Sequence, residues 1–299
     1  MTISASAVLA LTLGLGAATL LLDRQRLVRR VRRPRQMTML VFGTAAVLLP
    51  TNLYVAGHTH DGMSVEQVVV LGTIVALGML GIALLADRLP RSSSSAPRRV
   101  LAVGAHPDDI ELGCGGTLAK LIDSGHEVRA LVMSNGEKGG DGPTRAVEGT
   151  TAGQLIGVAG VEVLSLPDTR LTLHENDMVA AVERMIDRFN PDIILTHSGN
   201  DQHQDHRAVH VATLRAGRRH PSILCYESPS ATADFRPSVF VDVQDYLEVK
   251  VEAVATHDDQ RGKPYMRPEH LRGLAIFRGA QAKVRHAEAY EAVRMMGQL

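Results

Sequence analysis

Two short segments of the sequence gather side chains that bind metals or move protons. The first is AHPDD, residues 105–109, at the end of an apolar run that starts at residue 100. The second is SGNDQHQDH, residues 198–206, which follows another apolar run ending in His197. Ionisable side chains are costly at the end of a buried strand unless they meet a cation or do chemistry. A histidine and a carboxylate from the first segment and a histidine from the second make the three-ligand site of a catalytic zinc, with one position left for water.

Each segment also has a structural interpretation. Asp and Pro favour turns and helix N-caps, so HPDD alone is compatible with a turn before a helix. The sequence HQDH, residues 203–206, is on its own typical of a solvated helix cap. Because both occur at strand ends of one domain, the metal site is favoured. Gly115 and Gly116 do not belong to a GxGxxG pattern and indicate no dinucleotide.

The elements that carry these segments alternate between strand and helix patterns. Short apolar runs predict strands at residues 100–105, 128–133, 161–166 and 193–196. Helical spacing predicts helices at residues 117–124, 145–156 and 177–189. This alternation predicts an α/β fold with a Rossmann-like, mainly parallel sheet and helices on both faces. Ligands bind beyond the carboxyl ends of such strands, where both polar segments lie.

The first third of the chain has the composition of membrane helices. Three runs, 2–22, 37–57 and 67–86, contain no charged residue, and each has the roughly 20 residues that a helix needs to cross a bilayer. A cleaved signal peptide is disfavoured because no basic residue precedes the first run. Pro50 and Asn52 are expected to kink the second helix or to end it early.

Three parts of the chain follow from this pattern: a transmembrane region of about three helices at 1–90, a polar linker at 91–97 and a catalytic domain at 98–299. Seven arginines lie between residues 24 and 35, whereas 58–66 contains no Lys or Arg. The positive-inside rule therefore predicts a multi-pass protein of the cell membrane. Its N-terminus is expected outside, and its arginine loop and catalytic domain on the cytoplasmic side.

The charge balance argues against nucleic acid as a partner. From residue 98 onward the chain has 23 basic and 28 acidic residues, and a mildly acidic domain binds polyanions poorly. The arginines between residues 24 and 35 are better explained by topology and by contact with anionic lipids of the bilayer. Cys114 and Cys225 have no CxxC spacing, and we expect them to be small buried hydrophobic residues.

From residue 99 to about 296 the chain resembles the LmbE-like, or PIG-L, family of zinc-dependent N-deacetylases. AHPDD continues into a Gly-Gly pair and a helix as in that family, and HQDH differs from the usual His-Pro-Asp-His only by Gln204. Further matches are Gly136-Glu137, Arg145 with Glu148, Tyr226-Glu227, the segment KVEAVATHDDQ at 250–260, and Arg278-Gly279 ahead of Ala287-Glu288.

The resemblance implies a metal site and a general base. His106, Asp109 and His206 look like the ligands, and two imidazoles with one carboxylate suit zinc or ferrous iron. Asp108 remains unligated beside them and looks like the general base that takes a proton from water.

The resemblance also implies roles for three further side chains. His203, when protonated, looks like the group that stabilises the oxyanion and donates a proton to the leaving amine, while Asp205 orients a nearby imidazole and raises its basicity. Arg145 is a candidate for contact with substrate hydroxyls or a phosphate. A surface ion pair with Glu148, three residues further along a helix, is the alternative for this arginine.

The function implied is hydrolysis of the acetyl amide of an N-acetylglucosamine-type sugar. This sugar is expected to be linked to a lipid or to be a glycoside. Two other functions remain open. One is an amidase that cleaves a sugar-thiol conjugate and releases an acid larger than acetate. The other is a catalytically silent, membrane-anchored protein that binds sugar, although such a protein has no need of the unligated Asp108 and of His203.

Overall fold

The computed structural model describes residues 4–22, 31–57, 63–88 and 96–297. The chain divides into two compact units, Met1–Pro90 and Arg91–Leu299, which are described separately. The arginines at 24–30, the 58–62 part of the loop without basic residues and most of the expected linker lie outside the described residues.

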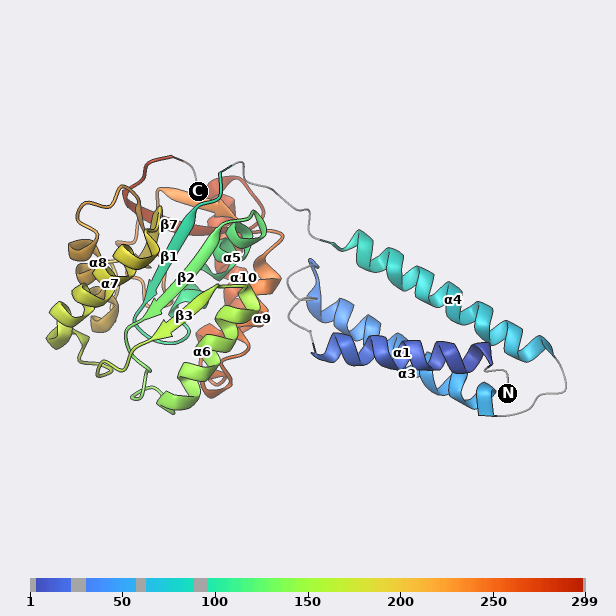
Figure 1. The fold of residues 1–299 in the computed structure, drawn as a ribbon. Helices are drawn as coiled ribbons and strands as arrows, with labels where there is room; N and C mark the ends of the chain where they lie inside the picture. Colours follow the sequence, from blue (N-terminus) through green and yellow to red (C-terminus); the bar gives the residue numbers. More distant parts are fainter. Residues whose placement is uncertain (1–3, 23–30, 58–62, 89–95, 298–299) are drawn as a thin grey trace. The chain divides into compact units, whose positions relative to one another are not determined.

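The N-terminal unit consists of α1 (Ala5–Leu22), α3 (Pro34–Gly57) and α4 (Met63–Ala86) (Figure 1). Two helical stretches, Pro34–Gly57 and Val65–Ala86, are long and apolar enough to cross a membrane, whereas the apolar stretch of α1 is shorter. Many of their large apolar side chains are exposed, as expected of helices that lack a protein core around them.

Two polar contacts connect α3 and the residue before it with α4 and the residue after it. The expected early end at Pro50 is wrong, because α3 continues through this proline to Gly57. Two residues after the proline, the buried Asn52 amide donates to the buried Thr73 hydroxyl of α4 at 2.9 Å, a type of contact that holds apolar helices together. At the other end, the buried Asp87 carboxylate accepts from the backbone and side chain of Arg33 at 2.9 and 2.8 Å.

A mixed seven-stranded sheet forms the centre of the C-terminal unit, with strand order β3-β2-β1-β4-β5-β7-β6. Its five parallel strands are β1 (Arg99–Gly104), β2 (Glu127–Val132), β3 (Gly160–Val163), β4 (Ile193–His197) and β5 (Ile223–Tyr226). The strands β6 (Val239–Asp242) and β7 (Ala287–Arg294) add an antiparallel edge. The predicted α/β class and mainly parallel sheet are therefore confirmed, and the antiparallel edge is an addition.

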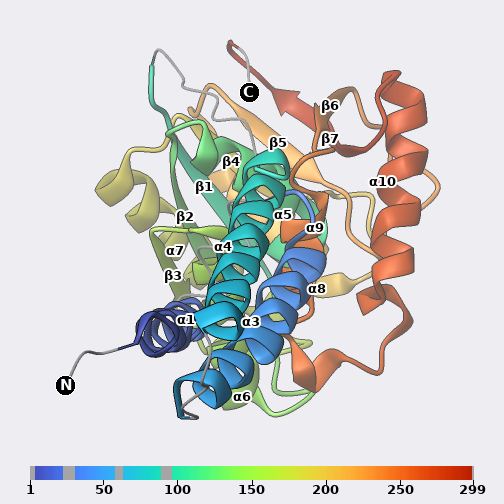
Figure 2. The same cartoon turned by 90° about the vertical axis from the view of Figure 1, so that its right-hand side faces the viewer.

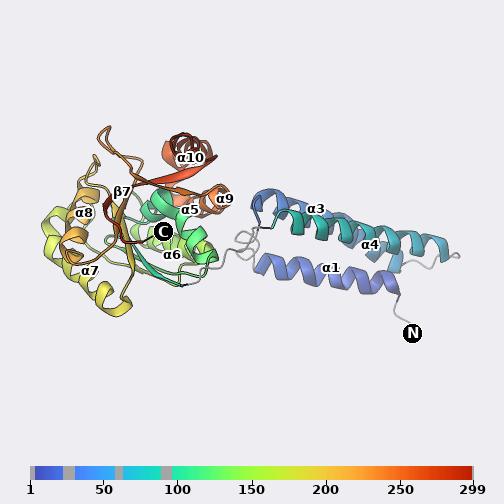
Figure 3. The same cartoon turned by 90° about the horizontal axis from the view of Figure 1, so that it is seen from above.

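Helices cover both faces of this sheet (Figure 3). On one face, α7 (Glu175–Phe189) and α8 (Gln204–Ala216) bury Met178, Val182 and Val209 against the strands. The other face carries α5 (Asp109–Asp123), α6 (Gly142–Ile156), α9 (Leu247–Val254) and α10 (Pro268–Ala282). Short 3-10 turns η1 (Leu171–His174), η2 (Asp258–Gln260) and η3 (Pro264–Met266) complete the unit. Helix α10 lies beside the antiparallel edge (Figure 2).

Helix α5 starts eight residues earlier than the sequence pattern predicts, within the AHPDD segment. Its glycines lower intrinsic helix propensity, but tertiary packing requires them. A Cβ on Gly113 would overlap the ring of Tyr226, lying 2.7 Å from Cε2. Tyr226 is fully buried, and its hydroxyl donates to the Val103 carbonyl of β1 at 2.8 Å. This close approach fixes the start of α5 beside the end of β1.

We therefore expect Gly113→Ala to destabilise the C-terminal unit by ~1–3 kcal/mol, because neither the buried ring nor the helix can move away freely. Thermal unfolding followed by circular dichroism should show a loss of about 2–4 °C per kcal/mol. Gly160→Ala is the matched control, since no atom lies within 4 Å of its added Cβ. Equal melting temperatures for the two variants would contradict this packing role.

Candidate functional site

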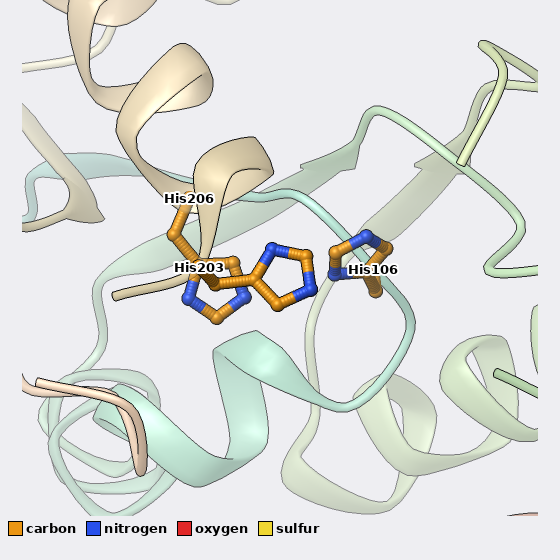
Figure 4. A group of neighbouring side chains, drawn as sticks. All are labelled: His106, His203 and His206. Carbon is orange, nitrogen blue, oxygen red and sulfur yellow. The ribbon is translucent and has the colours of Figure 1, made fainter. Parts of the chain in front are cut away.

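Three imidazoles meet beyond the carboxyl ends of β1 and β4 (Figure 4). His106 lies in the loop after β1, His203 immediately precedes α8, and His206 lies in its first turn. The ring centroid of His203 is 5.0 Å from that of His106 and 4.5 Å from that of His206. The convergence of the two polar segments, expected from the parallel sheet, is therefore present in the structure.

The Asp109 carboxylate lies between two of these imidazoles. Its Oδ1 is 3.3 Å from Nε2 of His206, and its Oδ2 is 3.4 Å from Nδ1 of His106. Backbone N–H groups of Ala105 and His106 donate to Oδ2 at 3.1 and 2.7 Å and fix the carboxylate. Burial alone would raise the pKa of Asp109, but His206 and His197 hold it well below its usual range.

The other nitrogen of each imidazole faces a further carboxylate. Nε2 of His106 lies 3.0 Å from Asp168 and 3.3 Å from Asp205, and Nδ1 of His206 lies 2.9 Å from Asp201. Burial lowers the pKa of His206, but the carboxylates around its ring outweigh this effect and raise the pKa to about 9. This arrangement, with one nitrogen held by a carboxylate and the other directed inward, is the usual one for histidines that bind a metal.

The described residues contain three overlapping groups whose ligand atoms lie within 4.8 Å of one another. These groups are His106 with His203 and His206, Asp109 with His197 and His206, and His106 with Asp168 and Asp205. His197 is fully buried, and its ring is stacked on that of His206 with the centroids 4.0 Å apart. This packing holds the His206 ring in place. The predicted ligands His106, Asp109 and His206 do not form one of these groups by themselves, but each belongs to at least one group and all three border an open cavity. Imidazole nitrogens and carboxylate oxygens are donor types that suit a divalent cation.

This cavity has a volume of about 340 Å³. It is lined by His106, Asp108, Asp109, Leu112, Lys138, Gly139, Arg145, Asp168, Thr169, His203, His206, Pro229, Ser230, Lys263 and Tyr265. Acidic and imidazole groups form one part of the lining, and three basic side chains form another. A small polar substrate can therefore reach the histidine and aspartate cluster from solvent.

The segment HPDD forms a turn before α5, and Asp108 occupies the N-cap position, as the structural interpretation expected, but its side chain makes no capping hydrogen bond. The residue is buried and has a φ of 121°, a backbone conformation that is strained for any residue with a Cβ. Burial, followed by the charge of Asp109, raises the pKa of Asp108 to about 6. Such strain and such a pKa are typical of a functional carboxylate.

The interpretation of HQDH, residues 203–206, as a helix cap is correct for His203 only. Nδ1 of His203 accepts from the backbone N–H of Asp205 at 3.2 Å, so the neutral ring carries its hydrogen on Nε2. Burial and then the nearby His206 and His106 lower the pKa of His203. Asp205 is not solvated: it is fully buried and accepts from the backbone N–H of Thr169 at 2.7 Å.

Arg145 is buried, so the predicted alternative of a surface ion pair with Glu148 is wrong. Its guanidinium donates to the Gly136 and Pro107 carbonyls at 2.6 and 3.2 Å and lies 3.4 Å from Asp108. Arg145 thus forms part of the cavity wall beside the candidate base.

The sequence analysis assigned no role to two carboxylates that anchor the imidazoles. Asp201 was part of the second polar segment, and Asp168 follows β3 near the same edge of the sheet. Because ligands bind beyond the carboxyl ends of parallel strands, this position in the sequence could have indicated both residues as members of the site. Ser228 and Ser230 also donate to Asp201, and no sequence pattern indicated them. The expected burial of both cysteines is confirmed.

Fold and site together define an α/β protein with a buried histidine and aspartate cluster beside a cavity, an arrangement suited to a metal-dependent hydrolase. The chain belongs to the PIG-L family: the family model described as GlcNAc-PI de-N-acetylase matches residues 101–217. It is 42% identical over 173 residues to the uncharacterized deacetylase YaiS of Escherichia coli, covering 56% of this chain and 94% of that protein. This family of deacetylases is the one that the sequence motifs indicated.

Two further similarities agree with this assignment. The diacetylchitobiose deacetylase of Thermococcus kodakarensis is 30% identical over 218 residues, which cover 64% of this chain and 81% of that enzyme. The structure of the conserved protein TT1542 from Thermus thermophilus superimposes with a TM-score of 0.60 at 24% identity, over 68% of this chain and 97% of that one. The latter similarity shows the fold alone.

The Asp201 contact with His206 leads to a prediction about metal affinity. Asp201→Asn removes the negative charge that holds and polarises His206, and we expect zinc affinity to fall by about 10–100-fold. Competition with a chromogenic chelator measures this affinity. Asp177→Asn is the matched control, because this exposed aspartate also contacts a histidine, His174, at 3.1 Å. Equal zinc affinity in both variants would show that Asp201 does not support the metal site.

Proposed function

We propose that this chain is a metal-dependent hydrolase that removes the acetyl group from an N-acetylglucosamine-type amide. The main observation is the convergence of His106, Asp109 and His206 on a cavity, with the unligated Asp108 next to them. The family membership supports the class of reaction, and the chitobiose-derived name of one relative supports an N-acetylated sugar as substrate.

His106, Asp109 and His206 are the proposed ligands of the metal. Two imidazoles and a carboxylate with an open position suit zinc, and ferrous iron is the alternative. Bound there, the cation supplies Lewis acidity that polarises the amide carbonyl and makes water a stronger acid near neutral pH. Asp205 keeps His106 in place from the side opposite to Asp109.

Asp108 and His203 are the proposed proton-transfer groups. An amide is a poor electrophile with a poor leaving group, so hydrolysis needs both a base for the attacking water and a donor for the departing nitrogen. Asp108 is the carboxylate that borders the cavity next to the ligands and accepts the proton. Because Nδ1 of His203 accepts from a backbone N–H, its Nε2–H is available to hydrogen-bond the oxyanion, and once the ring is protonated the imidazolium can give a proton to the departing amine.

We also propose that the N-terminal unit anchors the enzyme in the cell membrane as a multi-pass protein. The length and apolar composition of α3 and α4 support two spans, and α1 supplies a shorter third one. The arginines between residues 24 and 35 then lie on the cytoplasmic side together with the catalytic domain, while the loop at 58–66 lies outside.

Asp108 and Asp109 are adjacent, and their substitution should impair the enzyme in different ways. Asp109→Ala should lose bound zinc, because it removes one of three protein ligands. Asp108→Asn should keep zinc but lower kcat by ~100-fold to ~10,000-fold, since general-base assistance acts in the transition state. Zinc content and acetate release, measured on the same detergent-solubilised full chain, test both.

The opposite pattern, with zinc lost in Asp108→Asn and kept in Asp109→Ala, would exchange the two roles. Full activity of both variants would refute the deacetylase proposal. Release of an acid larger than acetate would identify the amidase that cleaves a sugar-thiol conjugate.

The proposed topology can be tested by cysteine labelling, because both native cysteines are buried. Asp61→Cys should react with a membrane-impermeant maleimide on intact cells, whereas Gln298→Cys should react only after the cells are opened. The unsubstituted chain gives the background. Labelling of the second variant on intact cells would contradict the cytoplasmic orientation.

A further inference from the structure

Leu112 of α5 lies between two cavities. It lines the large cavity that contains the histidine and aspartate cluster, and it also lines a second cavity of about 20 Å³. Leu271, Leu274 and Ala275 of α10 line the second cavity but not the first. Leu112 therefore separates the proposed reaction site from a small space beside α10.

Leu112 lies one helical turn after the two aspartates of the site. Helix α5 begins at Asp109, and the backbone N–H of Leu112 donates to the Asp108 carbonyl at 2.9 Å. Residues three and four positions apart lie on the same side of a helix. Leu112 therefore borders the cavity on the same side of α5 as the proposed base and the proposed carboxylate ligand.

An apolar cluster holds Leu112 in this position. Leu112 is only 4% exposed, and it packs with Val251 and Val254 of α9 and with Leu271 of α10. Tyr265, which also lines the large cavity, packs against the same cluster. Close-packed side chains do not move aside without disturbing their neighbours. The wall that Leu112 forms is therefore stiff.

The proposed reaction needs a place for the acyl chain of the amide. The carbonyl carbon of an acetamide carries an oxygen, a nitrogen and a methyl group. In the proposed reaction the oxygen faces the metal ligands and His203, and the nitrogen carries the sugar toward the open side of the cavity. The apolar methyl group takes the remaining direction, where contact with apolar surface is favourable.

The lining of the large cavity offers such a surface at Leu112. Pro229 is exposed and Tyr265 is half-buried, whereas Leu112 is buried next to Asp108 and Asp109. A space of about 20 Å³ beyond Leu112 is too small for an acyl chain while this side chain is present. The pocket for the acyl group therefore ends at Leu112.

We propose that Leu112 limits the length of the acyl group that the enzyme removes. Its side chain contacts the methyl group of the acetamide and excludes longer acyl chains from the space beside α10. This inference rests on the proposed deacetylase function and defines the acyl part of its substrate, with acetyl accepted and propionyl and butyryl rejected. One methylene group in an apolar pocket typically changes kcat/KM by about 10–200-fold.

The test compares the methyl glycosides of N-acetyl-, N-propionyl- and N-butyrylglucosamine as substrates of the full chain in neutral detergent. The released amine is measured with an amine-reactive fluorophore, so one readout serves all three acyl groups. In the unsubstituted chain we expect kcat/KM to fall by at least about 10-fold from acetyl to propionyl. Leu112→Ala removes three carbon atoms and joins the two cavities, so it should lower the ratio of kcat/KM for acetyl to that for butyryl by at least about 10-fold.

Leu271→Ala is the matched control, because it makes the same truncation in the same apolar cluster but borders only the second cavity. It should lower the melting temperature as Leu112→Ala does and keep the acetyl preference. Leu112→Val removes one carbon atom and should relax the preference toward propionyl, which tests the same wall if Leu112→Ala does not fold. Leu112→Met has a similar volume and should retain the preference.

Three results overturn the inference and leave the deacetylase proposal standing. These are equal kcat/KM for the three amides in the unsubstituted chain, an unchanged acetyl preference in the folded Leu112 variants with smaller side chains, or an equal loss of this preference in Leu271→Ala. Absence of amine release from all three substrates would instead refute the proposed function, and the acyl pocket would fail with it.

Discussion

The functional site depends on the position of one carboxylate, that of Asp109. Its two oxygens face His106 from the loop after β1 and His206 from α8, so it links two segments that are almost a hundred residues apart. The carboxylate can do this because backbone N–H groups at the end of β1 fix it, and because α5 begins at this residue. Displacement of α5 would therefore separate the histidines that the sheet brings together.

Several residues that match the family pattern maintain this position of α5 and do not take part in the chemistry. Tyr226 packs against Gly113 and bonds to β1. Glu288 of β7 accepts from the backbone of Gly116 and Thr117 within α5, at 3.0 and 2.7 Å, and is neutralised by Lys250 at 2.6 Å. A buried carboxylate without these partners would be costly, so the antiparallel edge and α9 stabilise the helix as one network.

The centre of the site holds more negative than positive charge from the protein itself. Asp168, Asp201 and Asp205 surround the imidazoles in addition to Asp109, and all four carboxylates are buried. Burial lowers the pKa values of His106 and His206, but these carboxylates outweigh it and raise both pKa values above their usual range. A divalent cation would compensate the same charge.

The sequence by itself determined the alternation of strands and helices, the two polar segments at strand ends and the apolar N-terminal runs. It could do so because the spacing of apolar residues and the composition of a segment are local properties of the chain. It also placed both segments at one edge of the sheet, since parallel strands share their carboxyl ends. It did not determine where α5 begins, the burial of Arg145, or the part of Asp168 and Asp201. These depend on contacts between distant segments, such as Gly113 with Tyr226, and on side-chain direction. Residue spacing does not encode side-chain direction, and the resemblance to the family alone separated Asp108 from Asp109 at the level of sequence. The tertiary structure gives the physical difference, because Asp109 faces two imidazoles and Asp108 lies beside Arg145.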